Sequence, residues 1–233
     1  MKYLVINAKN YAEASGSNLE RLTATIQDVA SKPTFREVSF FLAPPGFGLG
    51  SSILARSSFG VLAQHLDLAA VGASTGFSVP EIARSFGAAG SLINHSEHRI
   101  SPDDIERLVS RLRELGMTSI VCAMDDGEVA KFSRFSPDFI AVEPPELIGS
   151  GRAVSKVRPE IITESRDALQ NNKPAGSSTK LLCGAGIVDG IDAKLSTELG
   201  SDGVLVASGI IKAPDWKGKI EELARGLNDA EKR

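Results

Sequence analysis

The feature that most constrains the fold of this chain is a series of eight short apolar runs, which recur from one end of the sequence to the other. Most of these runs are continuous rather than alternating, and this is typical of parallel β-strands that are covered on both faces. We expect strands at 4–6, 38–42, 60–63, 91–93, 119–123, 139–142, 180–182 and 204–206.

Apolar residues at helical spacing lie between many of these runs, as at 19–29, 105–115 and 220–227. Ser101 provides an N-cap for the second of these helices, and Pro102 fits its first turn. The third helix of the chain is the weakest, because 66–78 predicts a long loop and 79–86 supplies barely two turns.

Eight strands that alternate with helices over 233 residues predict an α/β protein, a single (β/α)8 barrel. No linker divides the chain, so we expect one domain over residues 1–233. A doubly wound open sheet is the alternative. That fold favours a G-x-G-x-x-G turn after its first strand, whereas the stretch from Asn7 to Asn10 contains no glycine.

Charge and hydropathy exclude several classes of partner. The net charge of −3 is too small to indicate a nucleic-acid or membrane partner. No run approaches the roughly 20 apolar residues of a membrane span, and the apolar N-terminus is too short for a signal peptide. We therefore expect a soluble, cytoplasmic protein. Cys122 and Cys183 end apolar runs and are expected to be buried thiols.

Polar residues follow three of the predicted strands, where a barrel carries its chemistry. Lys9 follows the first strand, His95 the fourth and Glu143 the sixth. Taken singly, such a lysine is usually a surface charge, such a histidine is usually structural, and such a glutamate is often an exposed loop residue. Together they would supply a cation, an imidazole and a base, a set that suits proton abstraction next to a carbonyl group.

Glu143 also begins a stretch with the composition of a lid, residues 143–151. Two prolines stiffen its start, Leu147 and Ile148 form an apolar tip, and glycines at its end allow a large backbone movement. Such a lid would exclude water from the Glu143 carboxylate when it closes. The alternative is an ordinary loop between a strand and a helix.

Small residues follow the seventh and eighth strands, in the stretches 183–186 and 207–209. Their backbone N–H groups can approach an anion closely. Barrels frequently bind phosphate at this position with the help of a short extra helix, which Ile210 could begin. Either stretch alone is weak support, but the two together predict phosphate binding.

In combination these motifs resemble the triosephosphate isomerase family over nearly the whole chain, and in particular its shorter, archaeal-type branch. The resemblance rests on Asn7 and Lys9, on Asn94-His95-Ser96-Glu97, and on Glu143-Pro144 with the lid that ends at 148–151. It implies interconversion of dihydroxyacetone phosphate and glyceraldehyde 3-phosphate through an enediolate, in glycolysis and gluconeogenesis. It also implies that no metal or organic cofactor is needed.

The resemblance assigns a role to each motif. Glu143 would be the base, neutral His95 would polarise the carbonyl group, and Lys9 would stabilise the enediolate. Ser96 and Glu97 would lie behind these groups. The residues that would bind or enclose the substrate are Asn7, Lys9, Ile148, Gly149, Gly184, Ala207 and Ser208.

The resemblance further implies a homodimer or homotetramer, in which Thr75 enters a neighbouring subunit. Two residues depart from many relatives: Phe77 replaces a glutamate, and Val142 replaces a tyrosine or another larger residue. One rival is a different phosphate-binding barrel isomerase. The other is an inactive phosphate-binding barrel that acts as a binding or assembly protein, which would be expected to lack one of Lys9, His95 and Glu143.

Overall fold

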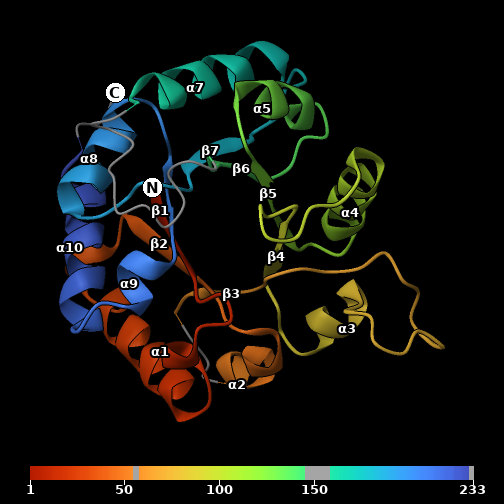
Figure 1. Cartoon of the computed structure of the whole chain (residues 1–233), viewed down its shortest axis with the longest axis horizontal. Helices are drawn as coiled ribbons and strands as arrows, with labels where there is room; N and C mark the ends of the chain where they lie inside the picture. Colours follow the sequence, from red (N-terminus) through yellow and green to blue (C-terminus); the bar gives the residue numbers. More distant parts are fainter. Residues whose placement is uncertain (55–57, 145–157, 231–233) are drawn as a thin grey trace.

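The computed structural model describes residues 1–54, 58–144 and 158–230, and its eight parallel strands close into a barrel. The strands pair in chain order, and β1 closes the ring against β8. Figure 1 shows the strands at the centre with helices around them. The strands are β1 (Lys2–Asn7), β2 (Val38–Ala43), β3 (Gly60–Ala63), β4 (Gly90–Ile93), β5 (Thr118–Ala123), β6 (Phe139–Val142), β7 (Lys180–Cys183) and β8 (Gly203–Val206).

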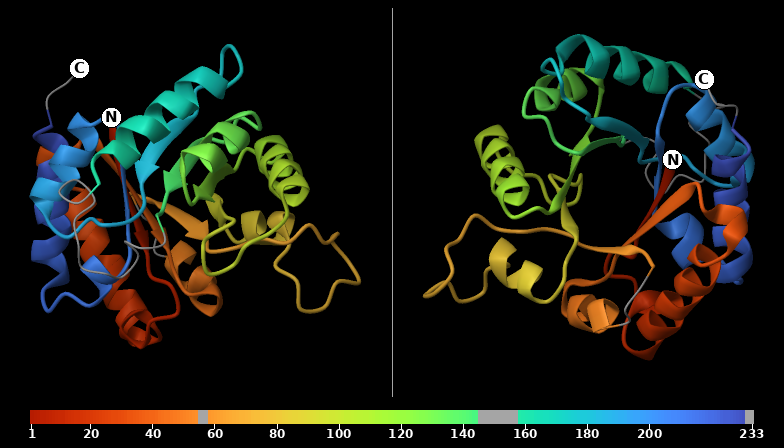
Figure 2. Two further views of the ribbon diagram at one scale, coloured as in Figure 1. Left: turned by 45° about the horizontal axis from the view of Figure 1, so that its top comes forward. Right: turned by 180° about the vertical axis from the view of Figure 1, so that it is seen from behind.

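The helices form the outer layer, which Figure 2 shows from two further sides. They are α1 (Ser17–Ala30), α2 (Leu49–Leu54), α3 (Pro80–Ser85), α4 (Pro102–Glu114), α5 (Asp126–Ser133), α7 (Glu160–Asn172), α8 (Gly190–Glu198), α9 (Ser208–Ile211) and α10 (Trp216–Asn228). Short 3₁₀ turns add η1 (Ala12–Ala14), η2 (Pro33–Phe35) and η3 (Gly46–Gly48). Ser101 caps α4 as predicted, because its hydroxyl accepts a hydrogen bond from the Asp104 N–H.

The apolar core has two layers because successive strand residues point to opposite faces of the sheet. On β1, Leu4 and Ile6 belong to the larger cluster, which packs under the helices, whereas Val5 belongs to the smaller one. All eight strands contribute to the smaller cluster, which therefore fills the barrel. Its members are Val5, Ala43, Leu62, Leu92, Ile120, Cys122, Phe139, Ala141, Leu182 and Leu205.

Aromatic side chains close the N-terminal end of the barrel. The Tyr3 and Phe139 rings meet edge to face with their centroids 4.8 Å apart. The Lys180 ammonium lies over both rings, 5.1 Å from the Tyr3 centroid and 5.4 Å from that of Phe139. The opposite end, at the carboxyl ends of the strands, is the end that remains for polar chemistry.

All eight predicted strands are confirmed, and most extend one or two residues beyond the predicted bounds. The long loop before α3 and the short length of α3 are confirmed as well. The predicted start of the extra helix at Ile210 is wrong, because α9 begins at Ser208 and ends at Ile211. Cys122 and Cys183 are buried free thiols, as expected.

The expectations about membrane spans and about the lid concern residues that the structure describes only in part. Within the described ranges, no helix has both the length and the apolar character that a membrane span requires. The predicted lid lies outside the described residues apart from its first two, Glu143 and Pro144.

Candidate active site

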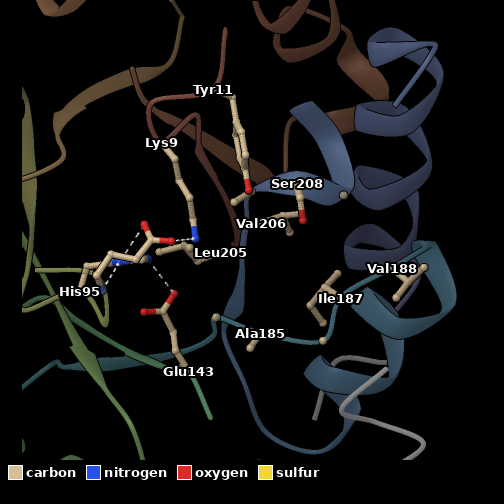
Figure 3. A pocket seen from close by; sticks show the side chains of 15 residues that line it. Lys9, Tyr11, His95, Glu143, Ala185, Ile187, Val188, Leu205, Val206 and Ser208 are labelled. Carbon is tan, nitrogen blue, oxygen red and sulfur yellow. Dashed lines mark hydrogen bonds and ion pairs between the residues drawn. The ribbon is translucent and has the colours of Figure 1, made fainter. Parts of the chain in front are cut away.

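Lys9, His95 and Glu143 line one cavity of about 360 Å³ at the carboxyl ends of the strands. Lys9 comes two residues after β1, His95 two residues after β4, and Glu143 directly after β6. Figure 3 shows the three side chains converging from separate elements. The barrel therefore brings together the three polar residues that the sequence places far apart.

The Lys9 side chain is held from both its backbone and its ammonium end. The backbone has a φ of 43°, a left-handed conformation that is uncommon for a residue other than glycine. Its N–H donates to Asn7 Oδ1 at 2.9 Å, and its carbonyl accepts from Gln64 Nε2 at 2.8 Å. The ammonium pairs with Glu97 Oε1 at 2.7 Å. This strained turn aims the cation along the cavity rather than out to solvent.

The tautomer of His95 follows from its backbone environment. The Glu97 N–H donates to His95 Nδ1 at 3.1 Å, so the neutral ring carries its hydrogen on Nε2. That nitrogen faces Glu143 Oε1 at 3.5 Å (Figure 3). Burial, assisted by the positive charge of Lys9, lowers the pKa of His95 to about 4. His95 is therefore a neutral hydrogen-bond donor at physiological pH.

The Glu143 carboxyl group is almost fully enclosed, with 3% of the residue exposed. Burial raises its pKa to about 7, although the Cys122 thiol and the Lys9 charge oppose that shift. Its Oε2 is buried and receives no N–H or O–H donor from the described residues. Gly184 makes room for it, since a Cβ there would lie 2.4 Å from Glu143 Cγ. The result is a carboxylate of unusual basicity.

Asn94 shapes the loop that presents His95. Its φ is 62°, its Nδ2 donates to the Cys122 carbonyl at 3.0 Å, and its Oδ1 accepts from the Ile100 N–H at 3.1 Å. The first bond ties the loop to β5, and the second joins the two ends of the loop. The Ser96 hydroxyl is buried and makes no hydrogen bond with the described residues.

The turns after β7 and β8 form the far wall of the cavity. Gly184, Ala207 and Ser208 line it, as the sequence predicts. Asn7 instead lines a second cavity of about 410 Å³, which also contains Lys9 and His95. Ile148 and Gly149 lie outside the described residues.

Sequence reasoning missed several lining residues, namely Tyr11, Ile187 and Val188 in the first cavity and Gln64 and His65 in the second. Tyr11 follows Lys9 by two residues, so its place in the same turn was a usable signal. Ile187, Val188 and Gln64 have apolar or amide side chains that resemble ordinary packing residues, and His65 is a single histidine with no motif around it.

The arrangement combines three groups whose functions are complementary. A basic carboxylate can remove a proton from carbon, a neutral N–H donor can polarise the adjacent carbonyl group, and a cation can stabilise the oxyanion that develops. Chemistry of this kind is proton abstraction next to a carbonyl group, in a pocket that also offers main-chain N–H groups to an anion.

Two kinds of comparison with known proteins point to one family. The sequence profile of the triosephosphate isomerase family matches residues 2–223. A triosephosphate isomerase from Cenarchaeum symbiosum is 48% identical and covers 97% of each chain. Proteins of the same name from Archaeoglobus fulgidus and Methanothermobacter thermautotrophicus are 43% and 44% identical, and they cover 96% and 94% of this chain and 97% and 93% of their own lengths.

NMR titration checks the two shifted groups directly. With three histidines in the chain, ¹⁵N spectra with His95→Gln as the assignment control should show His95 neutral, with its hydrogen on Nε2, down to pH about 4. ¹³C-labelled glutamate, assigned with Glu143→Gln, should show an inflection near pH 7. A His95 midpoint near the ordinary 6.5, or a hydrogen on Nδ1, would contradict the geometry.

Proposed function

Because this chain belongs to the triosephosphate isomerase family, we propose that it interconverts dihydroxyacetone phosphate and D-glyceraldehyde 3-phosphate. The observation that carries the proposal is the convergence of Lys9, His95 and Glu143 on one cavity. The inactive binding barrel would be expected to lack one of Lys9, His95 and Glu143, whereas this chain has all three. The reaction belongs to glycolysis and gluconeogenesis, and we propose that the protein acts in the cytoplasm.

Glu143 is the base in this reaction. Its carboxylate takes a proton from the carbon next to the carbonyl group, and the C–H electron pair forms the carbon–carbon double bond of the enediolate. The same carboxyl group then returns the proton to the neighbouring carbon. A pKa near 7 suits both steps, because the group is a stronger base than an ordinary glutamate and yet loses the proton readily.

His95 and Lys9 act on the oxygen atoms. The His95 Nε2–H faces the space beside Glu143, where it can donate to the carbonyl oxygen as negative charge develops. The Lys9 ammonium stabilises the same charge, and Glu97 holds that ammonium in place. A neutral imidazole is suited to this role because its Nε2–H can polarise the carbonyl group while the ring itself stays uncharged.

The main-chain N–H groups of Gly184, Ala207 and Ser208 bind the phosphate in this proposal. Their support is that all three residues line the cavity that contains the acid–base groups. Gly149 and Ile148 complete the phosphate site by family resemblance, and closure of the lid over the enediolate would exclude water and limit loss of phosphate.

Shortening the base tests its role. Glu143→Asp retracts the carboxyl group by about one methylene, and a displacement of that size can lower kcat by about 100-fold while KM changes far less. A coupled assay with glyceraldehyde 3-phosphate measures both constants. Glu106→Asp on the exposed face of α4 makes the same change remote from the cavity and should retain wild-type kcat.

The results separate the two questions. A Glu143→Asp enzyme with wild-type kcat would show that Glu143 is not the base. A folded wild-type protein that does not turn over the substrate would overturn the proposed function itself.

We also propose that the protein is a homo-oligomer, with a dimer as its smallest form. The loop at 64–79, between β3 and α3, projects away from the barrel and carries Thr75 (Figure 1). Large exposed apolar side chains occur in the loops after β2 and β3, on α3 and directly after it, and such a concentration is typical of an interface. They are Phe47, Val71, Phe77, Ile82 and Phe86.

An arginine placed in that loop should weaken the assembly. Thr75→Arg introduces a long charged side chain that a close interface would have to desolvate, so sedimentation velocity at equal concentration should show a larger monomer fraction. Ser178→Arg is the matched control, since Ser178 is exposed in the loop before β7, at the opposite end of the barrel. An unaltered oligomer in Thr75→Arg would reject this surface as the interface.

A further inference from the structure

Tyr11 occupies a position in the active-site cavity that the mechanism does not use. Its ring is half-buried and packs against the core. The side chain lines the cavity beside Lys9, and its hydroxyl points toward Ser208 at the start of α9 (Figure 3). The Ser15 hydroxyl donates to the Tyr11 backbone carbonyl, and no described residue forms a hydrogen bond with the ring hydroxyl. A phenol O–H at this point is available to a bound molecule.

Lys212 lies on the same tyrosine. Its ammonium is 4.9 Å from the centroid of the Tyr11 ring, a cation–π contact. Lys212 directly follows α9, whose first residue, Ser208, is one of the proposed phosphate-binding residues. The Tyr11 ring therefore holds a second cation, which lies outside the lining of the cavity but directly behind one of its lining side chains.

The charge balance of the cavity gives this cation a purpose. Lys9 is the one ammonium group among the described lining residues, against the carboxyl groups of Glu97 and Glu143. A phosphate monoester brings between one and two further negative charges at neutral pH. Main-chain dipoles offset part of that charge, and a lysine just behind the tyrosine would offset more.

We propose that Tyr11 and Lys212 form a recognition pair for the phosphate group of the substrate. The Tyr11 hydroxyl donates a hydrogen bond to a phosphate oxygen, and Lys212, held on the ring, adds favourable charge. This inference rests on the proposed function and refines it. The pair would make the enzyme select phosphorylated trioses over unphosphorylated ones, and it would have no part in the proton transfer.

The chain supplies its own matched control. It contains two tyrosines, and each has a lysine over its ring. Tyr3 lies at the closed N-terminal end of the barrel, with Lys180 at 5.1 Å. Tyr3→Phe and Lys180→Met therefore make the same chemical changes as Tyr11→Phe and Lys212→Met, but remote from the cavity.

Two readouts test the pair. The first is the ratio of kcat/KM for glyceraldehyde 3-phosphate to that for glyceraldehyde, and the second is the calorimetric Kd of sn-glycerol 3-phosphate, which needs no turnover.

Tyr11→Phe should lower the ratio and raise the Kd by about tenfold or more, the usual loss for a hydrogen bond to a charged group. Lys212→Met should change both by about two- to fivefold and reduce the dependence of Kd on salt. The Tyr3 and Lys180 variants should match wild type.

The outcomes are distinct. Tyr11→Phe with wild-type affinity for glycerol 3-phosphate would overturn the pair, as would equal losses for phosphorylated and unphosphorylated substrates, which would indicate a merely structural role. Wild-type protein that binds glycerol 3-phosphate without isomerising the triose would overturn the proposed function, while the Kd values would still decide the role of Tyr11. Wild-type protein that fails to bind glycerol 3-phosphate would overturn both.

Discussion

The chemistry of this barrel depends on one buried carboxyl group that faces one neutral imidazole. Glu143 Oε1 and His95 Nε2 are 3.5 Å apart, and burial is the largest cause of both pKa shifts. Burial disfavours charge, so it raises the pKa of the acid to about 7 and lowers that of the histidine to about 4. In water the two groups would form an ion pair near pH 5. Here the imidazole loses its proton near pH 4, and the carboxyl group ionises only near pH 7, beside an imidazole that is already uncharged.

This arrangement lowers the stability of the fold, and the surrounding contacts must compensate. Between pH 4.5 and about 7 the folded state holds a proton on Glu143 that the unfolded state has lost, so stability falls as pH rises. Between about 4 and 6.5 the unfolded state protonates His95 and the folded state does not, so stability falls as pH falls. The left-handed backbone conformations of Lys9 and Asn94 add strain energy, which the hydrogen bonds that hold these residues must also offset.

The strands could be predicted because parallel strands that are covered on both faces have continuous apolar sequences. Lys9, His95 and Glu143 could be predicted because each of them comes just after such a strand. Other features lay beyond the sequence. The start of α9 at Ser208 was missed because four residues are too few to show an apolar period. The pKa shifts of His95 and Glu143 depend on enclosure by residues distant in sequence. Tyr11 went unnoticed because an aromatic residue near a first strand usually belongs to the core.

A structure of the protein with a phosphate-bearing carboxylate that mimics the enediolate tests the central claim most directly. The account predicts the carboxylate of that analogue within hydrogen-bond distance of Lys9 Nζ, His95 Nε2 and the Glu143 carboxyl group at once, with its phosphate against the turns after β7 and β8. An analogue bound elsewhere, or one that reaches the phosphate turns while these three side chains point away from it, would contradict the account.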